Sequence, residues 1–295
     1  MANIIFFTLY LVGAVILSSL IMPILYMQLG DQPILALNKA IKYGSFLIAI
    51  AFIKPAINFR RLKKLDIFGI NSDGKGLLKK HLFSGLIWGF CLFLPITMAF
   101  WLLDIRDFSF DFIINLDFFI YTFFLTILTS LLIGTIEELF FRGILVQESF
   151  HNMSILLIVI TSSLIFSAFH FIKIPEILDP NIRWDTGIMY LYDAIMGYNI
   201  TLKVDAFVAL FLFGIALSIV KIRTKSIYYC IGLHACFVFL IKIYKQNSVV
   251  NFNSDYIHYI STYDHFIGLI AIFFLFLYVS AYMFYILSND VKTTY

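Results

Sequence analysis

The sequence predicts an all-α membrane protein, a polytopic bundle of about eight transmembrane helices with a buried polar active site. Hydrophobic residues make up 61% of the 295 residues and charged residues only 13%, whereas a soluble domain is nearer half apolar and a quarter charged. The apolar residues gather in runs that approach or exceed the roughly 20 residues needed to cross a bilayer. Two adjacent carboxylates, Glu137 and Glu138, lie inside one such run, and buried carboxylates are kept where they have a partner or a function.

Each apolar run is read as one span, with ends uncertain by about one helical turn. The predicted spans, in order, are 4–27, 41–58, 82–103, 118–141, 154–174, 205–221, 226–244 and 264–287. The first run lacks the basic start and small-residue cleavage site of a signal peptide, so we expect it to be retained. No run has the alternating pattern of a strand, and no polar stretch is long enough for a soluble domain. We therefore predict a single transmembrane domain, residues 1–295.

Basic residues set the predicted orientation, because loops rich in Lys and Arg stay in the cytoplasm. The loop after the second span and the loop after the sixth are the basic ones; their Lys and Arg residues are Arg60, Arg61, Lys63, Lys64, Lys75, Lys79 and Lys80, then Lys221, Arg223 and Lys225. With eight spans, both termini then lie in the cytoplasm. The loops on the opposite side are rich in Asp and Glu. The longest of these, 175–204, is expected to lie in the membrane interface.

Composition also excludes some function classes. The net charge of +3 is small, and the basic loops lack interleaved aromatic residues, so we expect no nucleic acid among the partners. Cys91, Cys230 and Cys236 fall in apolar spans without a C-x-x-C spacing, which is typical of small core residues rather than of a disulfide or a metal site.

The first polar group within the spans is Glu137, Glu138 and Arg142. Glu138 and Arg142 are four residues apart on a helix and can pair, with the acid in the favourable N-terminal position. Glu137 is turned about 100° away and remains available for another partner. The alternative, an intramembrane salt bridge that only locks two helices, leaves the second glutamate unexplained.

Two further groups each contain a histidine. Phe166 and His170 lie four residues apart in the fifth span, and His234 follows Gly232 in the seventh. A single histidine near the end of a span is more often a core or interface residue. Together, however, two glutamates, an arginine and two histidines supply what activates water: a base, a proton shuttle and a donor for a developing oxyanion.

At these residues the sequence resembles the CPBP family, the CAAX prenyl proteases of the Ras-converting type and their bacterial bacteriocin-processing and immunity relatives. The resembling motifs are EELFFR at 137–142, FSAFH at 166–170 and HACFV at 234–238, within about residues 118–245. The resemblance implies an intramembrane endopeptidase with a membrane-associated peptide or protein substrate. We also expect a bacterial inner membrane.

The resemblance assigns roles to the residues. Glu137 with His170 would activate water, His234 would stabilise the tetrahedral oxyanion, and Glu138 with Arg142 would brace the fourth helix. The site residues expected are Glu137, Glu138, His170 and His234 as catalytic and Arg142 and Phe166 as supporting.

One residue departs from the family pattern: Val238 stands where the family commonly has an Asn that helps bind the oxyanion. His234 then works alone, another donor such as Asn199 or a tyrosine replaces the Asn, or activity is weakened or lost. A distance along the spans also places Glu137 toward the cytoplasm and His170 toward the other side. A shift of each span by one turn, or a break in the fourth helix near Gly134, would bring them together.

Two other functions compete with the protease. One is a catalytically idle relative that acts as an immunity or scaffold protein, which Val238 supports. The other is a proton-coupled transporter, although no internal repeat of the kind common in transporters is visible. We favour hydrolysis without a metal because no H-E-x-x-H is present. The alternative is zinc, with Glu137, His170 and His234 as ligands.

Overall fold

The computed structural model describes residues 2–29, 36–60, 75–108, 116–146, 153–172, 174–177, 181–196 and 203–292. The described chain is almost entirely helical, which confirms the predicted all-α membrane fold. Every predicted span overlaps a helix. Six helices are long and apolar enough to cross a membrane, and two shorter apolar helices, Ile155–His170 and Leu269–Phe284, occupy the places of the fifth and eighth predicted spans. The chain is therefore an integral membrane protein.

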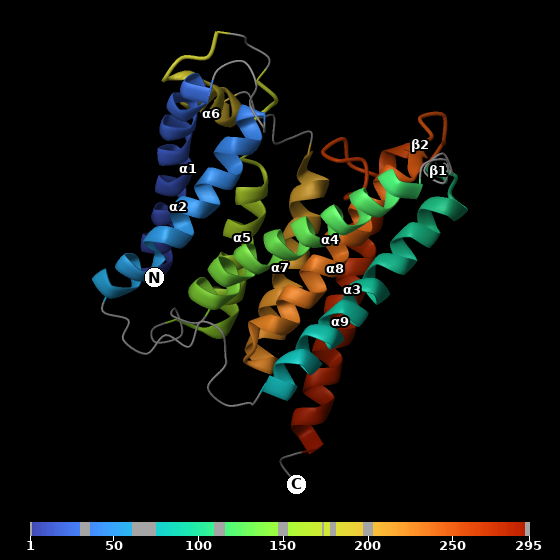
Figure 1. Ribbon diagram of the computed structural model, residues 1–295. Helices are drawn as coiled ribbons and strands as arrows, with labels where there is room; N and C mark the ends of the chain where they lie inside the picture. The colour runs from blue at the N-terminus through green and yellow to red at the C-terminus, as the bar shows by residue number, and fades with distance from the viewer. Residues whose placement is uncertain are drawn as a thin grey trace. The chain divides into compact units, whose positions relative to one another are not determined.

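The helices form two compact units. The first unit holds α1 (Ala2–Leu29), α2 (Leu37–Phe59) and α6 (Thr186–Met196), an 11-residue helix inside the stretch 175–204 that was expected at the interface. In this unit α1 and α2 run side by side (Figure 1). Ser18 Oγ donates to the Ile41 carbonyl at 2.7 Å and joins them. The single domain 1–295 stays a prediction.

The second unit holds the remaining helices and both strands. They are α3 (Lys75–Leu102), β1 (Arg106–Phe108), α4 (Leu116–Glu138), the π-helix η2 (Leu139–Val146), α5 (Ile155–His170), α7 (Val204–Thr224), α8 (Ile227–Gln246), β2 (Ser248–Val250), the 3-10 turn η5 (Ile257–Tyr259) and α9 (Leu269–Lys292). The last three residues of α5 belong to the first unit.

Glycines on facing surfaces bring α3 and α8 into backbone contact. A Cβ atom at Gly232 of α8 would lie 2.2 Å from the Leu82 carbonyl oxygen, and one at Gly85 of α3 would lie 2.2 Å from that of Tyr229. No side chain fits at either position. Small residues of this kind let helices in a membrane approach closely. Consequently α8 is held against α3 on one side and, at Gly134, against α4 on another.

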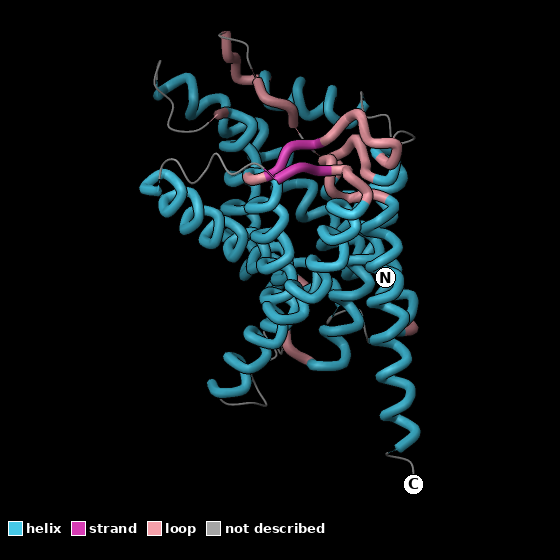
Figure 2. The backbone as a smooth tube through the Cα atoms, turned by 90° about the vertical axis from the view of Figure 1, so that its right-hand side faces the viewer, coloured by secondary structure: helices cyan, strands magenta, loops and turns pink. Residues whose placement is uncertain are grey.

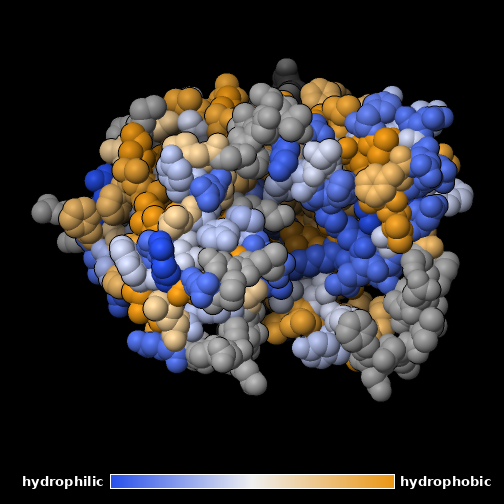
Figure 3. All heavy atoms as spheres, turned by 90° about the horizontal axis from the view of Figure 1, so that it is seen from above, coloured by the Kyte–Doolittle hydropathy of each residue, from blue (hydrophilic) through white to orange (hydrophobic). Residues whose placement is uncertain are grey.

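The expectation of no strands was wrong, because β1 and β2 form an antiparallel pair with Arg106 opposite Val250 (Figure 2). Strands of three residues are too short to show an alternating pattern. Side-chain bonds fix them instead: Arg106 Nε donates to Ser248 Oγ and Nη2 to the Ser248 carbonyl, both at 2.9 Å, while Nη1 donates to the His265 carbonyl at 3.0 Å. Hydrophilic residues gather on the face of the second unit that carries β1 and β2 (Figure 3).

Candidate functional site

The backbone changes form directly after the glutamate pair. α4 continues through Gly134 to Glu138, so the break that was considered near Gly134 is absent. From Leu139 to Val146 the chain forms a π-helix, and all of its side chains from Phe140 onward are buried. π-helical segments are rare and concentrate at functional sites. This segment carries Arg142 and turns it into the interior of the second unit.

Glu138 and Arg142 form the predicted ion pair. Arg142 Nη1 donates to Glu138 Oε1 at 3.0 Å, and the two side chains are 1% and 0% exposed. Arg142 Nη2 also donates to the Gly214 carbonyl of α7 at 3.2 Å, and its guanidinium lies 4.3 Å from the centre of the Phe166 ring. The arginine therefore joins η2 to α5 and α7 as well as to Glu138. The supporting role expected of Phe166 stays a prediction, with this contact as its structural basis.

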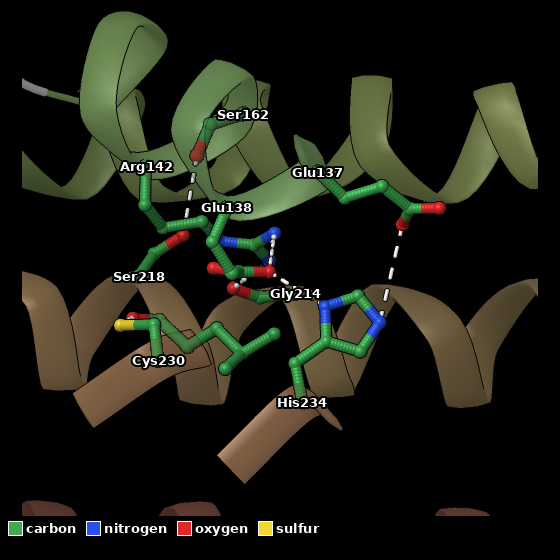
Figure 4. Close-up of polar contacts among 9 residues, drawn as sticks. Glu137, Glu138, Arg142, Ser162, Gly214, Ser218, Cys230 and His234 are labelled. Atoms are coloured by element: carbon green, nitrogen blue, oxygen red, sulfur yellow. Dashed lines mark hydrogen bonds and ion pairs between the residues drawn. The ribbon is translucent and has the colours of Figure 1, made fainter. Parts of the chain in front are cut away.

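His234 of α8 lies against both glutamates (Figure 4). Its Nδ1 atom is 2.8 Å from Glu138 Oε1, and its Nε2 atom is 3.9 Å from Glu137 Oε2. The sequence left Glu137 available for a partner, and its carboxylate faces this imidazole. Three residues from two helices thus form a row in which the imidazole lies between two carboxyl groups.

The row determines which ring nitrogen carries a proton. Arg142 is always charged, and the Glu138 carboxylate beside it can only accept hydrogen bonds. His234 Nδ1 must therefore donate to Glu138 Oε1. The hydrogen bond between Nδ1 and Glu138 then holds the imidazole with its Nε2 atom directed toward Glu137. A carboxylate bound to one ring nitrogen commonly fixes the orientation of a histidine in this way.

Aromatic rings and α7 complete the surroundings of the imidazole. The rings of Phe213 and Phe166 lie edge-on to His234, with centres 5.4 and 5.9 Å away. Gly214 was not identified from the sequence, although it is the sole glycine of α7. A Cβ atom there would lie 3.0 Å from that of Ser163, so the glycine lets α5 approach while its carbonyl accepts from Arg142.

Three other positions were singled out from the sequence: His170, Val238 and Asn199. His170 ends α5, is half-buried, and belongs to the first unit, whereas Glu137, Glu138 and His234 belong to the second. Its action with Glu137 stays a prediction. Val238 is half-buried one turn after His234 and offers no hydrogen-bonding side chain. Asn199, the suggested substitute donor, lies outside the described residues.

Within the described ranges, no group of three or more His, Cys, Asp and Glu is arranged to hold a metal ion. Glu137 Oε2 and His234 Nε2 are donors of the kinds that zinc accepts. Glu138 is already engaged by Arg142 and His234. The third predicted ligand, His170, belongs to the other unit.

Comparison with known proteins relates this region to one family. Residues 118–240 match the Rce1-like family, described as "Type II CAAX prenyl endopeptidase Rce1-like". The match spans α4, η2, α5, α7 and most of α8, and so contains every residue of the row. No curated protein and no solved structure matches the chain. The resemblance read from the three motifs is confirmed, and at the level of the family it supports a CAAX-type intramembrane protease.

Proposed function

We propose that this chain is an intramembrane endopeptidase that hydrolyses a peptide bond of a membrane-associated peptide or protein with a water activated by Glu137. The observation that carries the proposal is the row Glu138–His234–Glu137, buried between apolar helices inside the region that matches a protease family. Desolvated carboxylates are too costly to be kept without a partner or a function. Glu138 is paired with Arg142, and the Glu137 carboxylate faces His234 Nε2.

The proposed reaction begins with Glu137. Its carboxylate takes a proton from water, and the resulting hydroxide adds to the scissile carbonyl carbon. The carbonyl oxygen becomes an oxyanion, to which His234 Nε2 donates when the imidazole carries both protons; the flanking carboxylates offset that charge. The C–N bond then breaks, and the leaving amine takes the proton from Glu137. The products are one new carboxyl group and one new amine.

In this mechanism Glu138 and Arg142 are positioning residues. Glu138 accepts from His234 Nδ1 and so fixes the direction of the ring, and Arg142 holds Glu138 in place through their ion pair. His170 assists Glu137 in our proposal, as the second motif of the family implies. We place the protein in a bacterial inner membrane with both termini in the cytoplasm, and we propose that no metal takes part.

Replacing Glu137 tests the proposal. Glu137→Gln keeps the size of the side chain but cannot accept a proton, so turnover should fall by about 10²-fold or more while the protein folds normally. Membrane proteomes of strains with the wild type and with the variant would reveal the substrate as a protein that stays uncleaved. Glu176→Gln, at an exposed glutamate outside the spans, is the matched control and should leave cleavage unchanged. Undiminished cleavage by Glu137→Gln would contradict the role of Glu137 as the base, whereas the absence of any cleaved protein in both strains would identify an idle relative.

Turnover by the purified protein tests the role of zinc. With a metal-free mechanism, chelators should leave wild-type turnover unchanged. If Glu137, His170 and His234 hold zinc, chelation should abolish turnover and added Zn²⁺ should restore it. Reversible inhibition, together with zinc recovered at one per chain, would contradict the metal-free proposal.

A further inference from the structure

A cavity of about 460 Å³ lies in the second unit where α7 begins. One wall is the first turn of α7, and the other is segment 251–268, which joins β2 to α9. Val204, Ile257 and Ile260 supply aliphatic surface to it. No residue of the row Glu138–His234–Glu137 lines this cavity, so it is a separate site. Its volume falls within the range of about 300–1,000 Å³ that is typical of pockets for small organic molecules.

Hydrogen bonds hold segment 251–268 in one shape. Asp264 accepts from the backbone N–H groups of Phe266 and Ile267 with Oδ1, at 3.0 and 2.8 Å, and from Lys245 Nζ with Oδ2 at 2.9 Å. Arg106 donates from Nη1 to the His265 carbonyl at 3.0 Å. His265, which lines the cavity, has a φ of 55°. A residue other than glycine adopts this left-handed conformation only at a cost, which the surrounding bonds offset.

Asp205 gives the cavity a negative charge. It is the one formally charged side chain among the described residues of the lining. Its Oδ1 atom accepts from Ser261 Oγ and from the backbone N–H of Ala206, both at 2.8 Å. Oδ2 takes part in no hydrogen bond with the described residues. The start of α7 contributes only about half a positive charge, so the carboxylate outweighs it. Lys203 is not in the lining, and its Nζ lies 6.0 Å from the centre of the Tyr263 ring.

The other polar groups of the lining suit an organic cation. His258 and His265 each offer a ring nitrogen that accepts a hydrogen bond when the imidazole is neutral. With Asp205 they are donors of the kinds that zinc accepts, but within the described chain they are not arranged to hold a metal ion. The ring of Phe252 stands at 85° to that of His265, with centres 5.8 Å apart. Aromatic faces attract cations, and the aliphatic walls fit an apolar body.

We propose that this cavity binds an organic ammonium ion, with the ammonium at Asp205 and its apolar part against Val204, Ile257 and Ile260. The basic loops place this end of the protein outside the cytoplasm, so the ligand comes from the external solution or from the headgroup of an external lipid. The inference goes beyond the proposed peptidase and does not depend on it.

Three probes of similar shape test the charge of the ligand. The full chain is purified in a maltoside detergent and titrated, by ligand-observed NMR, with 2-phenylethylamine, 2-phenylethanol and phenylacetate. They carry a positive charge, no charge and a negative charge. We expect the amine to bind about tenfold or more tightly than the alcohol, because only the amine forms a charge-assisted hydrogen bond with Asp205. Phenylacetate should bind most weakly.

Variants then assign the preference to the cavity. Asp205→Asn keeps an acceptor oxygen for Ser261 and Ala206 but removes the charge, so it should bind amine and alcohol about equally. The matched control is Asp255→Asn, at an exposed aspartate of the same segment that does not line the cavity, and it should keep the preference. Thr262→Trp, at an exposed residue of the lining, should fill the cavity and reduce the binding of all three probes to that of empty micelles.

Several results would overturn the site. They are equal binding of amine and alcohol by the wild type, tightest binding of phenylacetate, a preference that survives Asp205→Asn, and amine binding that Thr262→Trp leaves unchanged. The last result decides even where Asp205→Asn fails to fold. Glu137→Gln should bind the amine like the wild type, so this test and that of the peptidase fail separately.

Added lipid identifies the source of the ammonium. Phosphatidylethanolamine carries a primary ammonium in its headgroup, whereas phosphatidylglycerol carries none. If the natural ligand is the lipid headgroup, phosphatidylethanolamine should weaken amine binding in the micelles and phosphatidylglycerol should not. If it is a soluble amine, neither lipid should compete. Both results keep the ammonium site at Asp205.

Discussion

Glu138 is the residue through which the candidate site is assembled, because a single oxygen, Oε1, accepts hydrogen bonds from both Arg142 and His234. The arginine approaches from the next turn of the same helix, and the imidazole from α8. An anion that receives two charge-compatible donors loses much less on burial than a lone carboxylate. The position of Glu138 therefore depends on Arg142, and the orientation of His234 depends on Glu138.

This dependence predicts the effect of Arg142→Ala. Without the guanidinium, Glu138 is left buried beside an imidazole and either takes a proton or destabilises the fold by several kcal/mol. We expect a lower protein level and a lower melting temperature, in addition to lost activity. The control is Arg183→Ala, at an arginine whose ion pair with Asp185 is largely exposed and contributes little. Normal abundance of Arg142→Ala would show that the pair does not stabilise the fold.

The contacts that the sequence predicted lie within one helix, whereas those it missed join different helices. The Glu138–Arg142 pair follows from spacing on one helix, and the motifs supplied His234. The Gly214 carbonyl accepts from Arg142 across helices, so this contact depends on how α7 packs against its neighbours. That packing is fixed by glycines and ring contacts far along the chain, which no local pattern encodes.

At the scale of elements, α8 is the centre of the site's geometry, since it packs on α3, α4 and α7. The spans were predicted well because hydropathy alone fixes a helix that must satisfy its backbone in lipid. The π-helix after Glu138 and the three-residue strands were not. The hydropathy pattern that locates a span cannot distinguish π from α geometry, and the strands are set by Arg106 and its bonds rather than by their own composition.

The close contact of α3 and α8 predicts the effect of Gly232→Ala. The added Cβ would meet the Leu82 carbonyl at 2.2 Å, and backbone cannot move aside as a flexible side chain can. We expect α8 to shift, with a clear fall in melting temperature and a loss of turnover as His234 leaves Glu138. Gly13→Ala is the matched control, because a Cβ at Gly13 of α1 meets nothing within 4 Å. If both variants melt like the wild type, the α3–α8 contact is not as tight as described.

At the scale of the whole molecule, the basic loops predict the orientation in the membrane. Reporter fusions within 59–81, most of which lies outside the described residues, and within 221–225 should report the cytoplasm. A fusion after Glu176, in the acidic stretch between the fifth and sixth predicted spans, should report the opposite side. A cytoplasmic signal at Glu176, or an external one at either basic loop, would reverse the proposed topology.

The pairing of β1 with β2 also has a consequence for synthesis. Arg106 and Ser248 are separated by 142 residues, so at the usual 5–20 residues per second the ribosome needs roughly 7–28 s to make the second strand after the first. During that interval α4 is in the membrane with Glu138 and Arg142 but without His234, and the glycines of α3 face lipid or the insertion machinery. The nascent protein is therefore most vulnerable to membrane proteases and quality control until α8 is inserted. Premature stop codons before α8 should leave products that are degraded rather than partially active.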